Sequence, residues 1–140
     1  MSLQQVKIIN LPKILDERGN LSFFQSDEHI PFGIKRVYWV YDVPGGEQRG
    51  GHAFKEQHEI IIALSGSFNV IVNDGRDEKV FSLNRSYYGL YIPKMIWRHL
   101  DDFSTNSLAL VASDRDYYEE DYIREKSFFI QAATNASNGF

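Results

Sequence analysis

The sequence has no cysteine, and among its 140 residues there are only four prolines and two tryptophans. Without thiols the chain can form neither disulfides nor thiolate metal sites, which is compatible with a reducing compartment, and we expect the protein in the cytoplasm. No apolar run reaches the roughly 18 residues of a membrane span, and the first ten residues lack the basic and apolar segments of a signal peptide. We therefore expect no contact with a membrane and no processing.

Positive charge is also in short supply. The chain carries 15 Lys and Arg against 19 Asp and Glu, a net charge of −4 and a pI near 5.5. No stretch gathers the basic residues that would hold a phosphate backbone, so nucleic acid is not an expected partner. Hydrophobic residues make up 43% and aromatic residues 14%, ample for one core. We predict a single domain over residues 1–140, with its core at about 6–130.

Short segments rich in Val, Ile, Tyr and Phe recur along the chain and are separated by turn signals. This arrangement is typical of an all-β sandwich or barrel. The segments predicted as strands are Val6–Ile9, Leu21–Gln25, Lys35–Tyr41, Glu59–Leu64, Phe68–Val72, Lys79–Ser82, Tyr87–Ile92 and Ser107–Ala112. This number of strands suits a jelly roll.

The connections between these strands carry their own signals. Asn73-Asp74-Gly75 predicts a tight hairpin, and Ser65-Gly66-Ser67 predicts a second turn. Pro44-Gly45-Gly46 begins a polar loop that we expect to run to Gly51. The acidic stretch Tyr117–Glu125 is the one predicted helix, and it is too short to stand without packing on the barrel. The small, polar tail Ala132–Phe140 is expected to be frayed.

The segment Gly50–Glu59, GGHAFKEQHE, resembles the first cupin motif, in which His-x-His is followed by Glu and then by Gly. The spacing puts His52 and Phe54 at the two histidine positions, and the later positions fall on Glu59 and Gly66. Alternate residues of a strand point to the same side, so positions 52 and 54 should both face the barrel interior.

The segment Tyr91–His99 resembles the second cupin motif, a Pro followed by a His, but the expected ligand position falls on Arg98. A catalytic metal needs about three protein ligands. Only His52 and Glu59 of the four motif positions can ligate, so we expect no metal and no cofactor. A one-residue bulge that turns His99 inward would weaken this expectation. Arg98 itself should either pair with Glu59, which we favour, or stabilise an anionic intermediate or a phosphate.

Longer strings narrow the resemblance further. They are Asp16–Leu21, Ile30–Tyr38, Arg49–Ala53, Tyr88–Ile92, and Ser113-Asp114 through Tyr122–Arg124. Together they resemble the nucleotide-sugar (dTDP-4-keto-6-deoxyglucose) 3,4-ketoisomerases, the WxcM-like cupins, over nearly the whole chain. The resemblance implies an all-β cupin, a double-stranded β-helix jelly-roll barrel with a short C-terminal helix. It also implies a homodimer, to which the strand Val6–Ile9 would contribute.

The chemistry implied by this resemblance is the isomerisation of a dTDP-linked 4-keto-6-deoxyhexose without a cofactor. A base removes the C3 hydrogen, an enediol forms, and a proton returns at C4, on the way to 3-amino deoxysugars of cell-surface glycans. Such a reaction requires one or two side chains of near-neutral pKa in a barrel that holds little water.

The resemblance also implies roles for individual residues. His52 matches the first motif histidine and is the predicted proton-transfer group, while Phe54 replaces the second histidine, to which the family's C3 base role is usually assigned. Candidates for the missing group are Tyr38, Tyr88, His99 and His58, of which Tyr38 and His99 are retained as catalytic candidates beside His52. The predicted substrate-binding residues are Arg36 and Arg49 for the diphosphate, with Tyr88, Tyr91, Arg98 and Phe54 around the sugar and base.

The replacement at Phe54 leaves other interpretations open. These alternatives are a related nucleotide-sugar epimerase, a ketoisomerase with an altered substrate, and a non-catalytic cupin that binds a sugar nucleotide. A stoichiometric metal would point instead to a metal-dependent cupin.

Overall fold

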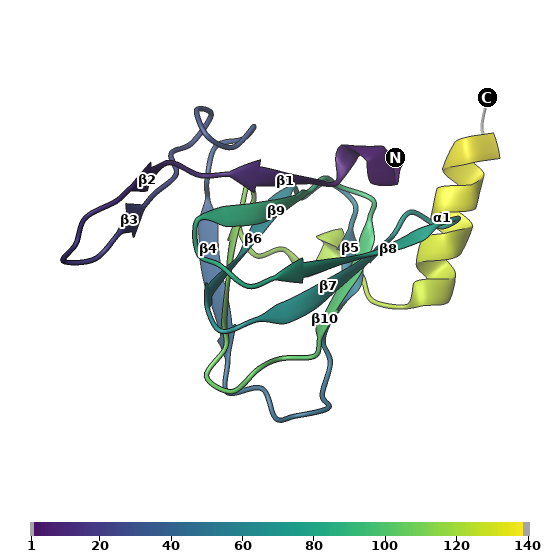
Figure 1. Ribbon diagram of the computed structural model, residues 1–140. Coiled ribbons are helices and arrows are strands. Elements are labelled where there is room, and N and C mark those ends of the chain that lie inside the picture. The colour runs from purple at the N-terminus through teal and green to yellow at the C-terminus, as the bar shows by residue number, and fades with distance from the viewer. Residues whose placement is uncertain (1, 139–140) are drawn as a thin grey trace.

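The computed structural model describes residues 2–138, which form two facing antiparallel β-sheets, a projecting hairpin and a C-terminal helix (Figure 1). The first sheet has the order β1 (Lys7–Asn10), β9 (Tyr88–Ile92), β6 (Glu59–Ser65), β11 (Leu108–Ser113) and β4 (Arg36–Tyr41). The second has the order β12 (Tyr122–Ile123), β5 (Arg49–Phe54), β10 (Trp97–Asp101), β7 (Phe68–Asn73) and β8 (Glu78–Leu83). The remaining elements are β2 (Lys13–Ile14), β3 (Leu21–Ser22), the 3₁₀ turns η1 (Leu3–Gln5) and η2 (Glu119–Asp121), and α1 (Lys126–Asn138).

The main core lies between the two sheets. Ile61 of β6, Val70 of β7 and Val111 of β11 are almost fully buried there. Ile60 and Ile62 point to the other face of β6, where a second cluster with Ile30 and Phe32 covers them. Because β6 is buried on both faces, it reads as an unbroken apolar run and not as an alternating one.

The fold class predicted from the sequence is confirmed, and all eight predicted strands are present with end shifts of a few residues. The list of predicted strands omitted β2, β5, β10 and β12, although the first motif had already placed positions 52 and 54 on one strand. The loop predicted from Pro44 to Gly51 was too long, because β5 begins at Arg49 and pairs with β10. The hairpin at Asn73–Gly75 is present: Asn73 Oδ1 accepts the Gly75 N–H at 2.7 Å, and Gly75 has a φ of 97°.

The predicted position of the helix was wrong. The stretch Tyr117–Glu125 contains η2 and β12, whereas the helix α1 covers most of the tail that we expected to be frayed. Phe129 of α1 is fully buried and packs against Trp97, with 6.0 Å between the ring centroids. That contact anchors the helix on the second sheet and supplies the packing that a short helix needs. Residues 139 and 140 of the predicted frayed tail lie outside the described residues.

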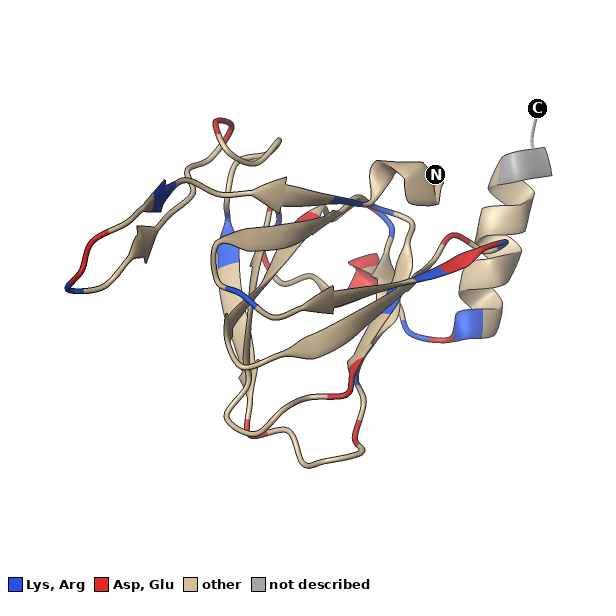
Figure 2. Ribbon diagram, in the orientation of Figure 1, with Lys and Arg blue, Asp and Glu red and all other residues tan. Residues whose placement is uncertain are grey.

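Charged residues of both signs are scattered over the elements of the described chain (Figure 2). Within residues 2–138 no helix is long and apolar enough to cross a membrane.

Candidate active site

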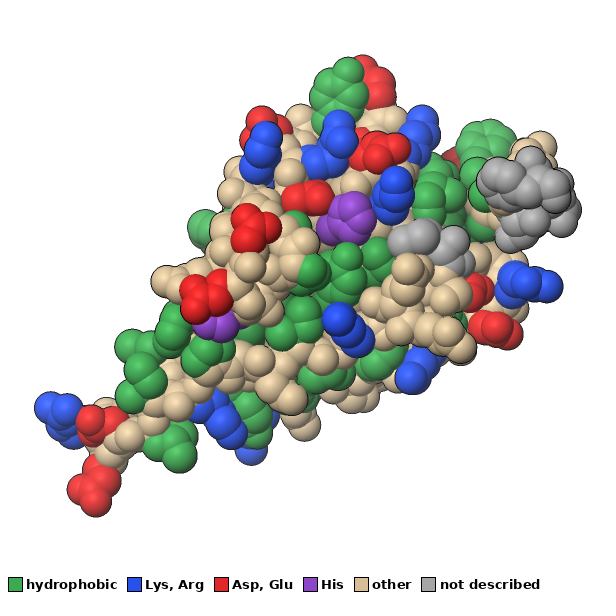
Figure 3. All heavy atoms as spheres, turned by 90° about the horizontal axis from the view of Figure 1, so that it is seen from above, with side chains coloured by type: hydrophobic (Ala, Val, Ile, Leu, Met, Phe, Trp, Pro, Cys, Tyr) green, Lys and Arg blue, Asp and Glu red, His purple; other side chains and the backbone are tan. Residues whose placement is uncertain are grey.

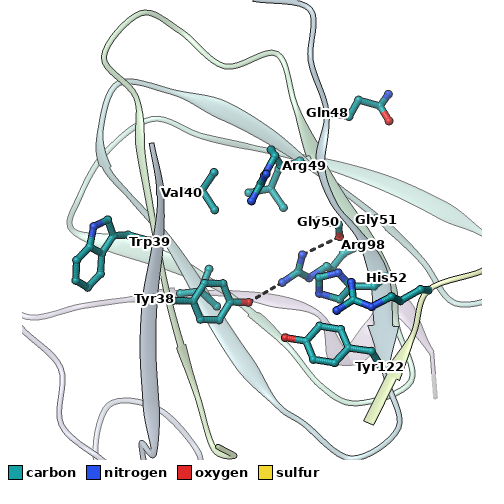
Figure 4. A pocket seen from close by; sticks show the side chains of 13 residues that line it. Tyr38, Trp39, Val40, Gln48, Arg49, Gly50, Gly51, His52, Arg98 and Tyr122 are labelled. Carbon is teal, nitrogen blue, oxygen red and sulfur yellow. Dashed lines mark hydrogen bonds between the residues drawn. The ribbon is translucent and has the colours of Figure 1, made fainter. Parts of the chain in front are cut away.

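A cavity of about 500 Å³ opens between the two sheets, with β4 on one side and β5, β10 and β12 on the other (Figure 4). Polar side chains dominate its wall. The lining residues are Tyr38, Trp39, Val40, Gln48, Arg49, Gly50, Gly51, His52, Arg98, Leu100, Val111, Tyr122 and Arg124.

A buried ion pair forms the floor of this cavity. Arg98 is held by Glu59, with Nε 2.7 Å from Oε2 and NH2 3.1 Å from Oε1, and both side chains are at most 3% exposed. Burial acts to lower the pKa of Arg98, but the Glu59 carboxylate raises it above its usual value, so the guanidinium stays charged. The ion pair favoured from the sequence is therefore present.

Arg98 can lie here because the neighbouring strand contributes a glycine. Arg98 NH1 donates to the carbonyl of Gly50 at 2.8 Å, and a Cβ at position 50 would collide with this same nitrogen. Gly50 also has a φ of 73°, in the left-handed region that favours glycine. Gly50 thus leaves room for the Arg98 guanidinium, and His52, two residues later on the same strand, lies beside it.

Tyr38 extends this network across the cavity from β4. Its hydroxyl accepts a hydrogen bond from Arg98 NH2 at 3.0 Å and donates to Glu59 Oε1 at 3.4 Å. Burial and the Glu59 charge raise the pKa of Tyr38, so the hydroxyl keeps its proton. Tyr38 and Arg98 together form a hydrogen-bonding wall facing His52.

His52 is 8% exposed and sits among aromatic rings. Its ring centroid lies 4.8 Å from that of Phe54 and 4.9 Å from that of Tyr122, and its buried Nε2 has no hydrogen-bond partner among the described residues. Burial, and then the charges of Arg98, Arg124 and Arg36, lower its pKa to about 2. The imidazole is therefore neutral and able to accept a proton.

Arg36 stands behind the cavity wall. Its NH2 group donates to Gln57 Oε1 at 3.0 Å and to the Tyr122 hydroxyl at 3.3 Å, and its guanidinium lies 4.9 Å from the ring centroid of Tyr38. It is not among the residues that line the cavity, and its contacts hold the aromatic side chains that do.

The segment that carries Tyr122 is fastened to the turn after β5. The buried carboxylate of Asp121 accepts the backbone N–H groups of Glu56 at 2.8 Å and Gln57 at 3.1 Å, and the Asp121 carbonyl accepts that of Lys55 at 2.9 Å. These bonds fix the register in which Tyr122 faces Phe54.

Five residues singled out from the sequence meet at this place: Tyr38, Arg49, His52 and Arg98 line the cavity, and Phe54 packs against His52. Other candidates lie elsewhere. His99 points away and lies 3.8 Å from Asp101, Tyr88 hydrogen-bonds Asn84, and Tyr91 stacks on Phe32 outside the barrel. His58 pairs with Asp114 at 2.8 Å on that outer face, as alternation from Glu59 predicts.

The sequence interpretation did not include Tyr122, Arg124 and Gln57 in the site. Tyr122 and Arg124 depend on β12, a two-residue strand that was assigned to a helix. Only the position of Tyr122-Ile123-Arg124 among the strings that carry the family resemblance pointed to these two, whereas Gln57 lies inside the first motif segment.

The described residues hold no group of three or more His, Asp or Glu side chains placed to bind a metal. The cavity instead offers a neutral imidazole, a fixed cation and two phenol hydroxyls. A neutral base beside a fixed cation can remove a proton from a carbon and stabilise the oxyanion that results.

Comparisons with known proteins identify the relatives of this chain. The model of the FdtA family, described as WxcM-like, C-terminal, matches residues 4–134. The TDP-4-oxo-6-deoxy-alpha-D-glucose-3,4-oxoisomerase of Aneurinibacillus thermoaerophilus is 40% identical over 124 residues, 88% of each chain.

Solved structures show the same likeness. The sugar 3,4-ketoisomerase QdtA of Thermoanaerobacterium thermosaccharolyticum, in complex with TDP, superposes with a TM-score of 0.93 at 36% identity, covering 96% of this chain and 98% of that one. A His-to-Asn mutant of that enzyme, in complex with TDP-4-keto-6-deoxyglucose, gives a TM-score of 0.93 at 35% identity, with coverage of 96% and 97%.

Proposed function

Because this chain belongs to the FdtA family of WxcM-like proteins, we propose that it is a TDP-sugar 3,4-ketoisomerase that acts on TDP-4-keto-6-deoxyglucose. The observation that carries the proposal is a neutral, buried His52 beside the fixed cation Arg98 in a cavity of about 500 Å³. That volume is in the range of cavities that enclose a small molecule.

In the proposed reaction His52 accepts the proton from C3. The electrons of that bond form a C3–C4 double bond, and negative charge moves to the C4 oxygen. Arg98 stabilises the charge on that oxygen, and the Tyr38 hydroxyl holds the guanidinium in place, because a preorganised cation stabilises charge as it develops. The proton of the O3 hydroxyl passes to the C4 oxygen, the protonated His52 returns its proton to C4, and a carbonyl remains at C3. No cofactor takes part.

His52 needs to gain a proton during this cycle although its pKa in the empty cavity is lowered to about 2. The surrounding arginines contribute to that lowering after burial itself. A bound diphosphate brings negative charge into the cavity that Arg98 and Arg124 line, which opposes their effect on the imidazole. Substrate binding would in this way raise the pKa of His52 from the value that burial and these cations set.

Arg49 is exposed, lines the cavity and is the proposed diphosphate ligand, because a guanidinium can clasp phosphate oxygens bidentately. Arg124 also lines the cavity, and Glu119 holds its Nε at 2.6 Å and its NH2 group at 2.9 Å. Arg36 is half-buried behind Tyr122, and its proposed role is to hold that side of the wall. Phe54 occupies the position of a second imidazole, where its ring packs against His52 and excludes water from that side of the histidine.

A homodimer is also part of the proposal. β4 is the edge strand of the first sheet, and its Val37, Trp39 and Tyr41 are exposed. The arm, residues 13–22 with β2 and β3, projects from the barrel (Figure 3). Its Ile14 and Leu15 are exposed. An exposed apolar arm and an exposed apolar edge on one chain suit an exchange between two copies.

The 3-keto product would be ready for amination at C3, in the biosynthesis of deoxysugars for cell-surface glycans. We place this step in the cytoplasm, since a chain without cysteine suits a reducing compartment.

The test is proton NMR of the metal-free protein with TDP-4-keto-6-deoxyglucose in D₂O. We expect the C3 proton signal to disappear and a 3-keto product to form. His52→Asn should abolish both, whereas His99→Asn should retain them, because His99 lies outside the cavity.

Other outcomes would assign a different function. Saturable binding without exchange would indicate a sugar-nucleotide-binding protein. Exchange at C5 in place of C3 would indicate an epimerase.

A further inference from the structure

A 3,4-ketoisomerisation moves two protons, and the groups described so far account for one of them. His52 carries the carbon-bound proton from C3 to C4. The oxygen-bound proton must also pass from O3 to O4, and this transfer requires a group that can both donate and accept. In the sequence the obvious second position is 54, which holds a phenylalanine. The inference below rests on the proposed function and concerns this second transfer.

Tyr122 occupies the space beside Phe54. The two residues are direct partners in the antiparallel pair of β12 and β5, and their ring centroids are 4.6 Å apart. Side chains directly opposite each other in such a pair lie on the same face of the sheet. Tyr122 also contacts His52, with 4.9 Å between centroids, and its hydroxyl is directed across the cavity towards the side of Tyr38 (Figure 4).

The two phenols of the cavity differ in their hydrogen bonds. The Tyr38 hydroxyl donates to Glu59 and accepts from Arg98, so its proton is already engaged. The Tyr122 hydroxyl accepts from Arg36 NH2, and among the described residues no acceptor takes its proton. Tyr122 can therefore donate to a ligand without giving up an internal bond. A neighbouring guanidinium also stabilises the negative charge left on the oxygen when its proton departs.

We propose that Tyr122 is a catalytic residue that carries the hydroxyl proton from O3 to O4, in place of the side chain missing at position 54. In the first half of the reaction His52 takes the C3 proton, the C–H electron pair becomes the C3–C4 double bond, and the C4 oxygen carries the negative charge beside Arg98. Tyr122 then donates its proton to this oxygen. The products of this half are a neutral enediol, an imidazolium and a phenolate.

In the second half the Tyr122 phenolate takes the proton of the O3 hydroxyl. The O3 electron pair forms the C3 carbonyl, and the double-bond electrons take the proton of His52 at C4. Both side chains return to their starting states, and no oxidant, reductant or cofactor is required. The two oxygens of a cis-enediol lie next to each other, so one phenol hydroxyl can serve both.

This division of labour separates two observable events. Exchange of the C3 proton with solvent needs His52 and the hydrogen-bonding wall of Tyr38 and Arg98. Product formation also needs Tyr122. In Tyr122→Phe we therefore expect deuterium exchange at C3 to persist while conversion to the 3-keto sugar falls by about 10²-fold or more, the usual contribution of a general acid–base group. A role confined to packing would affect both events together.

The experiment measures both events by NMR in D₂O for the wild type, Tyr122→Phe and Tyr118→Phe. Tyr118 is an exposed tyrosine of the same segment and lies outside the cavity, so its variant should behave as the wild type. A fourth protein combines Tyr122→Phe with Phe54→His. Because positions 54 and 122 face each other, the histidine at position 54 should restore part of the lost conversion.

Each outcome decides the assignment. Loss of conversion with retained exchange in Tyr122→Phe, and recovery in the double variant, would support it. An active wild type with an equally active Tyr122→Phe would overturn the Tyr122 assignment alone. A parallel loss of exchange and conversion without recovery in the double variant would also overturn it. A wild type that forms no 3-keto product would overturn the proposed function and the assignment together.

Discussion

Arg98 and Glu59 form a two-point ion pair in the barrel interior, Nε to Oε2 at 2.7 Å and NH2 to Oε1 at 3.1 Å, with exposures of 3% and 1%. The two residues come from facing sheets, since Arg98 lies on β10 and Glu59 on β6. The pair therefore links the sheets and at the same time fixes the cation that faces the cavity. Its removal should affect stability and chemistry together.

Glu59→Gln tests the contribution of this pair to stability. The substitution leaves the buried Arg98 charge without its counter-ion, and breaking a buried pair in this way costs about 3–5 kcal/mol of the free energy of unfolding. Glu56→Gln is the control, because Glu56 pairs with Lys94 at the surface, where such pairs contribute about 0–1 kcal/mol. Urea titrations of both variants measure the difference, and equal losses would contradict the interpretation.

The lowered pKa of His52 predicts a dependence of stability on pH. In the folded chain this pKa is about 2, while in the unfolded chain it is near 6.5. Between these values the unfolded chain binds one proton more than the folded chain, so stability falls as the pH falls below about 6.5. The contribution of one group is at most about 1.4 kcal/mol per pH unit.

Urea titrations from pH 7 to pH 4.5 measure this effect. His52→Asn removes the titrating group, so the variant should lose less stability over the interval than the wild type. The other three histidines are present in both proteins, so their contributions cancel in the comparison. Parallel curves would show that His52 takes up a proton as readily in the folded chain as in the unfolded one.

The elements predicted from the sequence are those whose own residues carry the signal. β4, β6 and β7 are rich in Val, Ile and aromatic residues, which favour strands. β5 has the sequence RGGHAF, in which two glycines weaken the strand signal. It forms because β10 and β12 pair with it from distant parts of the chain, and such pairing leaves no local pattern.

The site residues also separate into those that the sequence predicted and those that depend on distant contacts. His52, Arg98 and the pairing of Arg98 with Glu59 follow from motif spacing, because alternation along a strand decides which side chains enter the barrel. Tyr122 and Arg124 enter it from a short strand whose position depends on the backbone bonds that Asp121 accepts. The helix was predicted too early in the chain because the acidic stretch 117–125 was assigned to it. The helix α1 that forms instead depends on the packing of Phe129 against Trp97, a tertiary contact that leaves no local pattern.

Arg49 predicts a change in nucleotide affinity. If its guanidinium clasps the diphosphate, Arg49→Ala should weaken TDP binding by about 10- to 100-fold, the value of a charged hydrogen bond of about 1.5–3 kcal/mol. The loss should shrink as salt is added, because exposed charges are screened. Arg85→Ala, an exposed arginine outside the cavity, should leave the affinity unchanged. Calorimetric titration with TDP measures both variants, and an equal affinity would remove Arg49 from the binding site.

The exposed arm predicts a concentration-dependent dimer that a single charge can disrupt. Leu15 is 71% exposed in the isolated chain, so in a monomer its replacement by glutamate would cost almost nothing. In a dimer that buries the arm, the same change puts an unpaired carboxylate into an apolar contact and should shift the protein to the monomer. Light scattering across a concentration series measures the mass of Leu15→Glu against the wild type.

Val80→Glu is the matched control for this experiment. Val80 is 55% exposed on β8, the edge strand of the opposite sheet, so the substitution has the same chemistry at a different apolar edge. A dimer that persists in Val80→Glu and is lost in Leu15→Glu would locate the interface at the arm. The reverse result would move the interface to β8, and a monomeric wild type at all concentrations would exclude the dimer.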